Sequence, residues 1–207
     1  MFQPRFHPPL APLDFETFLD QYPEEGDRYE LIEGEQIAVR PIGEHELVAI
    51  FLNDELSWEI RRLGLNYAVS RNTLVQCDRP YNGYLPDVIV LDKLALGSDP
   101  AWARASTLSR GKSAKLVIEV VSQNWATDYG PKLTDYEQLQ IPEYWIVDYL
   151  GLGAGRYIGV PKRPTLSVYS WVEGEYQVQQ FRGTERIVSQ VFPELQLTAA
   201  QIFQASG

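Results

Sequence analysis

The chain has 207 residues, of which 44% are hydrophobic and 12% aromatic. This composition supports one sizeable buried core and excludes an intrinsically disordered protein. A single cysteine, Cys77, excludes an intrachain disulfide framework. No apolar stretch reaches the roughly 18–20 residues that span a bilayer, and the first residues lack the pattern of a signal peptide. We therefore predict a soluble, cytoplasmic protein with no membrane partner and a single domain over residues 1–207.

The net charge of −10 argues against a protein that binds nucleic acid, because such proteins normally attract phosphates with Lys and Arg. The charge is unevenly distributed, however. Residues 1–59 carry 14 acidic and 3 basic residues, whereas residues 60–207 carry 14 acidic and 15 basic residues. One segment between two candidate strands is basic, with Lys93, Arg104, Arg110, Lys112 and Lys115. This segment is either a solvated loop with ordinary charges or a surface that grips a phosphate backbone.

The N-terminal part predicts a short helix, a hairpin and a long helix. In chain order these are a helix over 14–22, strands over 29–32 and 36–39, and a helix over 43–63. Asp14 is placed to cap the first helix, and Glu33-Gly34 forms the turn between the two strands. The long helix is predicted because apolar residues recur on one face at helical spacing, and Gly64 ends it.

The central part alternates apolar runs with turns. The strand-like runs are Tyr67–Cys77, Asp87–Leu91, Lys115–Val121 and Tyr144–Val147. The segment Lys93–Ala114 is long and has few apolar residues, so it is predicted to be a mobile insertion. Asp128 is expected to cap a helix that carries Pro131 in its first turn and continues to about Gln140. The glycine-rich stretch Gly151–Gly159 is predicted to be a loop without the spacing that cradles phosphate.

The C-terminal part predicts a second hairpin, Leu166–Val172 and Tyr176–Phe181, followed by a strand near Arg186–Val188 and a short helix after Thr198. The whole pattern indicates a mixed α/β (α+β) fold with a central mixed sheet flanked by helices. Its core covers about 43–150, with an N-terminal helix and hairpin at 13–40 and a C-terminal hairpin and helix at 165–203.

One carboxylate interrupts a run that otherwise reads as a buried strand, because Glu119 lies within Leu116–Val121. An ionised carboxylate there costs several kcal/mol unless a cation or strong donors meet it. A second acid, Asp87, follows Pro86 and opens another apolar run. If the two strands are neighbours, both acids can bind one hard divalent metal ion. The alternative is that Asp87 caps a turn and Glu119 pairs with a buried cation.

The helix after Asp128 supplies a basic partner for this pocket. Lys132 lies on the same helix face as Tyr136, one turn further on. A lysine on an inward face either snorkels to solvent or meets an anion. Asp128, one turn earlier, either orients Lys132 in the pocket or forms a simple surface pair with it. The sequence leaves both interpretations open.

Two further residues are weaker candidates. His45 lies at the start of the apolar face of the long helix, where the helix dipole favours a neutral imidazole that can accept a proton or bind a metal. A hydrogen-bonded core histidine is the competing interpretation. Glu35 follows the first hairpin turn and is a candidate ligand of a metal or of water, although exposed acids are common in turns.

At these residues the chain resembles the bacterial family of putative restriction endonucleases, which is abundant in cyanobacteria. The resemblance covers about residues 13–203. It is carried by the segments Tyr29–Glu35, Leu85–Val88, Leu116–Ser122, Asp128…Lys132…Tyr136 and Pro142–Asp148. It implies the PD-(D/E)xK nuclease fold, and an Mg²⁺- or Mn²⁺-dependent endonuclease that acts on nucleic acid, with DNA expected.

The resemblance also implies roles for individual residues. Asp87 matches the PD aspartate and Glu119 the (D/E)xK acid, and the Val120 carbonyl is a third expected metal ligand. The slot two residues after Glu119 holds Val121 instead of lysine, and Lys132 matches the position to which the family's lysine has moved. Glu35 and His45 match positions typical of the family. The run Ser122–Trp125 departs from the family pattern, which puts the shape of the pocket rim in doubt.

The sequence therefore supports hydrolysis of phosphodiester bonds with Asp87, Glu119 and Lys132 as catalytic residues. A homodimer is a further expectation, because nucleases that cut both strands often work as symmetric pairs. The alternative from another class is a nuclease-fold module that has lost its site and binds nucleic acid or protein without cutting. The acidic composition favours that alternative.

Overall fold

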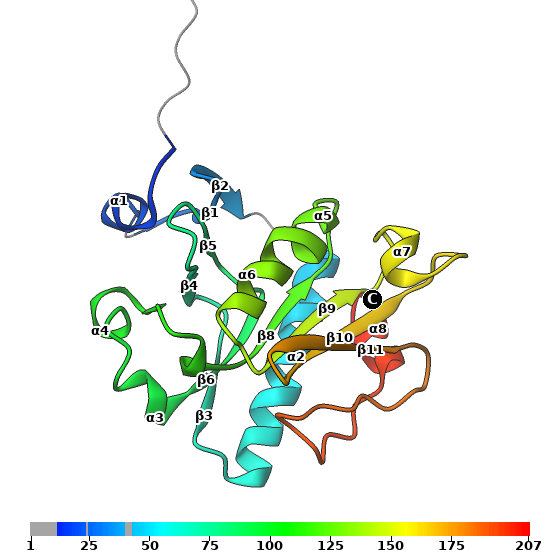
Figure 1. Cartoon of the computed structure of the whole chain (residues 1–207). Coiled ribbons are helices and arrows are strands. Elements are labelled where there is room, and N and C mark those ends of the chain that lie inside the picture. Colours follow the sequence, from blue (N-terminus) through cyan, green and yellow to red (C-terminus); the bar gives the residue numbers. More distant parts are fainter. Residues whose placement is uncertain (1–11, 24, 40–42) are drawn as a thin grey trace, which may run out of the picture.

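The computed structural model describes residues 12–23, 25–39 and 43–207, and two sheets form the framework of this part of the chain (Figure 1). The larger sheet has six strands in the order β11-β10-β9-β8-β6-β3, and the smaller sheet has five in the order β2-β1-β5-β4-β7. Helices pack on the larger sheet, as Figure 1 shows. The mixed α+β class predicted from the sequence is confirmed. No helix in the described ranges is long and apolar enough to cross a membrane.

The strands are β1 (Arg28–Ile32), β2 (Glu35–Val39), β3 (Tyr67–Ser70), β4 (Leu74–Gln76), β5 (Gly83–Tyr84), β6 (Val88–Asp92), β7 (Thr107–Leu108), β8 (Ala114–Val120), β9 (Glu143–Asp148), β10 (Thr165–Val172) and β11 (Glu175–Phe181). The helices are α1 (Phe15–Asp20), α2 (Gly43–Leu63), α3 (Lys93–Leu96), α4 (Trp102–Ala105), α5 (Trp125–Thr127), α6 (Leu133–Gln138), α7 (Gly155–Ile158) and α8 (Ala199–Gln204).

The six-stranded sheet is mixed. Strands β8 and β9 run parallel, and every other neighbouring pair in this sheet is antiparallel. Because parallel neighbours need a crossover, the helical segment α5–α6 connects β8 to β9 and lies against the sheet (Figure 1). All but one of the seven residues of β8 are buried, so this central strand is covered on both faces.

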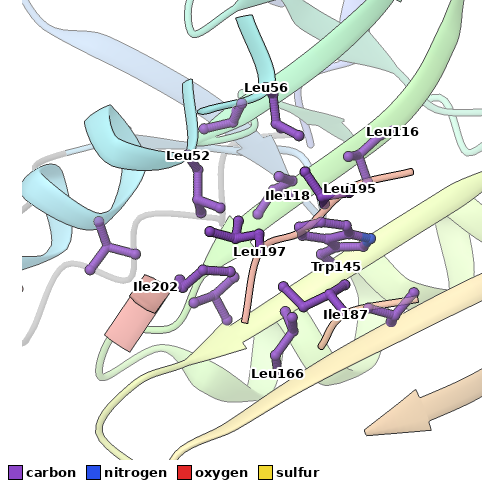
Figure 2. Close-up of a cluster of buried hydrophobic side chains, with 14 of the residues drawn as sticks. Leu52, Leu56, Leu116, Ile118, Trp145, Leu166, Ile187, Leu195, Leu197 and Ile202 are labelled. Carbon is purple, nitrogen blue, oxygen red and sulfur yellow. The ribbon is translucent and has the colours of Figure 1, made fainter. Parts of the chain in front are cut away.

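One face of the six-stranded sheet packs against α2, α8 and the C-terminal segment. Figure 2 shows Leu52 and Leu56 of α2 beside Ile118 of β8 and Trp145 of β9. Residues Ile187, Leu195, Leu197 and Ile202 complete this cluster, and each of them is almost fully buried. The apolar stripe predicted for the long helix therefore faces the sheet, as expected.

The opposite face of the sheet packs against α6 and the smaller sheet. Val117 and Val121 lie on this side, in one cluster with Tyr136 of α6 and Tyr84 of β5. Side chains alternate along a strand, so Glu119 points to this same face, as the sequence predicted. The carboxylate of Glu119 is therefore enclosed between the two sheets and the α5–α6 segment.

The two predicted hairpins and three of the predicted helices are confirmed. Asp14 caps α1 by accepting a hydrogen bond from the Thr17 amide at 2.8 Å. The turn between β1 and β2 places Glu33 and Gly34 at positive φ, which glycine adopts readily. The long helix α2 has the predicted bounds, and Thr198 forms a capping box with Gln201 at the start of α8.

Several expectations at the edges of elements are wrong. The predicted strand Tyr67–Cys77 is two strands, because the chain turns after Ser70 and passes from β3 in the larger sheet to β4 in the smaller one. The predicted loop Gly151–Gly159 contains the helical turn α7. The predicted strand near Arg186–Val188 is reduced to one bridge between Arg186 and Thr198.

The segment Lys93–Ala114, predicted to be a mobile insertion, forms ordered structure instead. It contains α3, α4, β7 and a 3₁₀ turn over Gly111–Ser113. The buried Asp99 organises the segment, because its two carboxylate oxygens accept hydrogen bonds from Ser109, Arg110 and Ser113. The low apolar content of this segment was therefore a poor indicator of mobility. Hydrogen bonds to the buried Asp99 carboxylate order the segment in place of an apolar core.

Candidate active site

Strand pairing brings the two predicted acids to the same edge of the larger sheet. Strands β6 and β8 are antiparallel neighbours with Val88 opposite Ile118. Asp87 immediately precedes β6, and Glu119 and Val120 end β8, so the start of one strand meets the end of the other. The Val120 amide donates a hydrogen bond to Asp87 Oδ2 at 2.7 Å. The expected adjacency of these two strands is therefore confirmed.

Lys132 lies between buried carboxylates. Its Nζ is 2.9 Å from Glu30 Oε1, 3.1 Å from Glu119 Oε1 and 3.7 Å from Asp128 Oδ1. Lys132 is only 5% exposed and Asp128 only 6%. The interpretations of a snorkelling lysine and of an exposed Asp128–Lys132 pair are both wrong. The hydroxyl of Tyr136, one helical turn beyond Lys132, donates to Glu119 Oε1 at 2.9 Å.

The helix that carries Lys132 differs from its prediction in a way that shapes the site. The helical segment begins at Trp125, so Asp128 is an internal residue and not the N-cap. Residues Asp128–Lys132 form a π-helical turn that contains Pro131. Proline cannot donate the usual helical hydrogen bond. Single π turns within helices are rare, and they occur frequently at functional sites. Asp128 and Lys132 are both buried and both face the pocket.

Glu30 on β1 is a site residue that the sequence analysis missed. It is 8% exposed, and its Oε1 accepts a hydrogen bond from the Leu85 amide at 3.0 Å besides its contact with Lys132. A signal existed, because Glu30 lies within the apolar run Tyr29–Ile32 just as Glu119 lies within its own strand. Glu35, the hairpin acid predicted instead, is exposed on β2 and does not line the pocket. The expectation that Glu35 joins the site is therefore wrong.

His45, near the start of α2, is held between two of the candidate metal ligands. Its Nε2 is 2.8 Å from the Val120 carbonyl oxygen and 3.2 Å from Asp87 Oδ2. Burial lowers the pKa of His45, but the hydrogen bond and charge of Asp87 and the Val120 carbonyl outweigh it, so the net pKa is raised. The nearby Asp87 carboxylate thus acts against the neutral imidazole that the helix dipole was expected to favour.

The charges in the pocket do not balance. Burial raises the pKa of Glu119 well above its usual range. The charge of Lys132 lowers this pKa, but the neighbouring carboxylates raise it again. Burial likewise raises the pKa of Asp128 to about 7. The pKa of Lys132 is lowered by burial but raised more strongly by Glu119, Glu30 and Asp128, so its ammonium is firmly held as a cation. Among the described residues, four carboxylates face one lysine and one histidine.

These residues line one cavity of about 550 Å³. Its floor holds the carboxylates, Lys132 and His45. Its rim is formed by Ile37 and Ala38 of β2, by the Ser122–Asn124 turn, and by Leu150 and Leu152 after β9. The lining residues thus place the cavity at the edge of the larger sheet, between the first hairpin and the segments that follow β8 and β9. Figure 1 shows how these elements are arranged.

The donor set fits a hard divalent cation. The contacts made by the described residues use only Oδ2 of Asp87 and only Oε1 of Glu119, which leaves one oxygen of each carboxylate uncommitted. The Val120 carbonyl oxygen is a third potential metal ligand. It accepts a hydrogen bond from His45 Nε2–H, which lies between this oxygen and Asp87 Oδ2. In the described ranges no three His, Cys, Asp or Glu side chains already surround one point. Oxygen donors with excess negative charge suit Mg²⁺ or Mn²⁺.

The basic segment between the strands lies away from this cavity. Lys93 follows the last residue of β6 and Lys115 is near the start of β8, so both lie at the opposite ends of the strands from Asp87 and Glu119. Arg104 is paired with Glu16 and Asp20 of the α1 helix, and Lys115 is paired with Asp92. This segment does not provide a positive rim for the pocket.

A mixed sheet with two acids at one edge and a lysine on the adjacent helix is the arrangement of a restriction-endonuclease-like fold. The family model described as putative restriction endonuclease (Uma2) matches residues 15–200, and the chain belongs to that family. A crystal structure of a putative nuclease of the DUF820 group from Anabaena variabilis ATCC 29413 has a similar fold. Its TM-score is 0.71 at 16% identity, over 94% of this chain and 99% of that one. No curated protein matches the chain.

Proposed function

We propose that this protein is a metal-dependent endonuclease that hydrolyses phosphodiester bonds, with DNA as its substrate and Mg²⁺ or Mn²⁺ as its cofactor. One observation carries the proposal. Four carboxylates, those of Glu30, Asp87, Glu119 and Asp128, converge on one pocket and exceed the positive charge that the described residues bring to it. A divalent cation offsets this excess, which is costly in a buried site.

Asp87, Glu119 and the Val120 carbonyl would hold the ion. Tyr136 and Lys132 both contact Oε1 of Glu119 and thereby fix the orientation of its other oxygen. The Val120 amide fixes Asp87 in the same way. A bound Mg²⁺ or Mn²⁺ ion supplies an activated water nucleophile and offsets negative charge on the scissile phosphate.

Lys132 acts as a fixed positive charge in this proposal. Because three carboxylates raise its pKa, its ammonium keeps the proton and does not serve as a general base. It orients the attacking water or stabilises the pentavalent phosphate, where negative charge increases in the transition state. Glu30 and Asp128 act as positioning residues for the ammonium, and His45 is an accessory residue that positions Asp87 and Val120.

A cleavage assay tests the proposal. Purified protein with Mn²⁺ should nick or linearise supercoiled plasmid DNA, and Asp87→Ala should abolish this activity while circular dichroism shows an unchanged fold. Lys132→Met should also lower the rate, by about 10²-fold or more, because it removes charge stabilisation in the transition state. Unchanged cleavage by Asp87→Ala would remove this residue from the mechanism.

The alternative function is a module that binds nucleic acid or protein without cutting. Two observations favour it: the net charge of −10 opposes the approach of a polyanion, and the described residues do not present a fully assembled metal site. Binding of Mn²⁺ separates the two proposals, because a site without function should bind the ion no better than Asp87→Ala does.

We also propose that the protein works as a homodimer, which would present one site to each strand of a duplex. The exposed ridge of α2 supports this, because Leu47, Ile50 and Trp58 are 48%, 41% and 55% exposed on one helix face. The acidic Glu44 and the basic Arg61 lie at opposite ends of the ridge, so two antiparallel copies would bring opposite charges together. Light scattering with Leu47→Glu as the variant tests this assembly.

A further inference from the structure

The connection between β9 and β10 is the most positive stretch next to the pocket. Residues 149–164, called the basic loop below, contain Arg156, Lys162 and Arg163 and no acidic residue. The absence of acids continues to residue 172, in a chain whose net charge is −10. All three basic side chains are exposed, and none is in an ion pair with a described residue. Their charge is therefore directed to solvent.

The basic loop begins at the rim of the cavity. Leu150 and Leu152, near its start, line the cavity. Lys162 Nζ donates a hydrogen bond to the Leu152 carbonyl at 3.1 Å, so its ammonium lies directly behind the rim. The backbone of Arg163 packs against Gly151, where an added Cβ would approach within 3.1 Å, so the end of the loop is held against its start. The Lys162 ammonium is thus placed close to the entrance of the pocket, and the Arg163 backbone lies beside it.

Aromatic contacts hold the third charge in a fixed position. The guanidinium of Arg156 lies 4.7 Å from the ring centroid of Tyr157. The ring of Tyr157 stacks on Tyr129, at 4.6 Å between centroids, and also meets Trp125 edge-on. Tyr129 lies in the π-helical turn that carries Asp128 and Lys132. Figure 1 shows α7 beside α5 at the same edge of the larger sheet, so the loop and the catalytic helix are packed together.

We propose that the basic loop binds the phosphate backbone of the nucleic acid beyond the scissile bond, and so brings a strand into an otherwise acidic pocket. This inference rests on the proposed nuclease function and adds the surface that makes it compatible with a net negative chain. Exposed Arg and Lys side chains release counterions when they contact phosphates, without reading the sequence. The affinity of the loop for nucleic acid should therefore fall with increasing salt and should not depend on base sequence.

A charge-matched pair of variants tests the inference. The loop variant is Arg156→Gln/Lys162→Gln/Arg163→Gln, and the control is Lys93→Gln/Arg110→Gln/Lys112→Gln. Both lose three positive charges, and the control residues are exposed, form no ion pair with a described residue and lie away from the pocket. Affinity for a fluorescein-labelled 20-base-pair DNA and for one of its strands is measured by anisotropy in EDTA, from 25 to 200 mM KCl.

The loop variant should lose roughly tenfold or more in affinity, and its slope of log K against log salt should be smaller by about 2, since each phosphate contact contributes roughly 0.7–0.9. The control should stay within about twofold of the wild type. Equal losses in both variants, no loss in either, or no binding by the wild type would overturn the inference. Because Lys162 also holds the loop, Arg156→Gln/Arg163→Gln serves as a second variant that leaves this contact intact, and it should lose most of the same affinity.

Cleavage measured in parallel separates this inference from the proposed function. If both are correct, the loop variant should raise KM for Mn²⁺-supported cleavage and leave kcat unchanged. If the wild type binds DNA through the loop but no Mn²⁺-supported cleavage occurs, the nuclease proposal fails and the inference stands. If cleavage depends on Asp87 but is indifferent to the loop variant at every substrate concentration, the inference fails and the nuclease proposal stands.

Discussion

Two buried aspartates, Asp99 and Asp128, occupy opposite ends of the same sheet and have opposite electrostatic surroundings. Asp99 is 5% exposed, and it accepts hydrogen bonds from backbone amides and from the hydroxyls of Ser109 and Ser113. Burial raises its pKa, but these donors lower it more, so its net pKa is below the usual value. Asp128 is as well buried, at 6%, yet its pKa is raised to about 7, because burial together with the charges of Asp87 and Glu30 outweighs the opposing effects of Lys132 and His45.

We infer from this difference that Asp99 is a structural carboxylate, whereas Asp128 belongs to the proposed functional site. The fold provides Asp99 with enough donors to stabilise its charge, and Asp99 in return holds the segment between β6 and β8. In the pocket the described residues provide one lysine and one histidine for four carboxylates. An uncompensated buried charge destabilises the folded state, and such charges cluster at functional sites. Binding of a cation is a function that requires this excess of negative charge.

The matched variants Asp99→Asn and Asp128→Asn should therefore have opposite effects on the free energy of unfolding. Asp99→Asn should destabilise the protein by about 1–3 kcal/mol, because buried donors lose their acceptor. Asp128→Asn should stabilise the metal-free protein by about 1–3 kcal/mol at pH 8, and it should lower cleavage activity. Urea denaturation in EDTA, followed by tryptophan fluorescence, measures both.

The sign for Asp128 follows from its raised pKa. An unfolded aspartate loses its proton near pH 4, whereas the folded one loses it near pH 7, so the folded state binds more protons between these values. Wild-type stability should accordingly fall as the pH rises from about 4 to 7, and this component should vanish in Asp128→Asn. If both variants destabilise the protein equally at pH 8, the two carboxylates do not differ as described.

A smaller effect is expected at the acids of the first hairpin. Glu30→Gln should lower kcat for plasmid cleavage by about 3–10-fold, because Lys132 loses one nearby anion while the amide oxygen can still accept the Leu85 amide. Glu35→Gln, at the first residue of β2, should leave the initial rate unchanged within error. Equal rates for the two variants would remove Glu30 from the positioning of Lys132.

The sequence predicted the regular elements well because local signals determine them. The apolar stripe of α2, the cap at Asp14 and the positive-φ turns of both hairpins all act within a few residues. The split of Tyr67–Cys77 between two sheets was not predictable, since both halves have the same strand-like composition and only tertiary packing separates them. The order of the Lys93–Ala114 segment depends on one long-range cluster around Asp99, which no local pattern reveals.

For the site, the sequence predicted the neighbouring placement of Asp87 and Glu119, and the inward face of Lys132, because a charged residue inside an apolar pattern requires a partner. The same argument applies to Glu30, but the sequence pattern did not distinguish it from the other acids of the first hairpin. It also misplaced Asp128 as a cap, since the helical segment begins four residues earlier, with Asn124 as its N-cap, and continues through the π turn that contains Pro131. The roles of these residues in catalysis remain predictions for experiment.

Isothermal titration of the metal-free protein with Mn²⁺ tests the central claim most directly. The account predicts saturable binding by the wild type, and loss of that binding in both Asp87→Ala and Glu119→Gln while Glu35→Gln behaves as the wild type. Binding of equal strength in the wild type and in both acid variants, or no binding at all, would contradict the claim that the excess buried negative charge is a cation site.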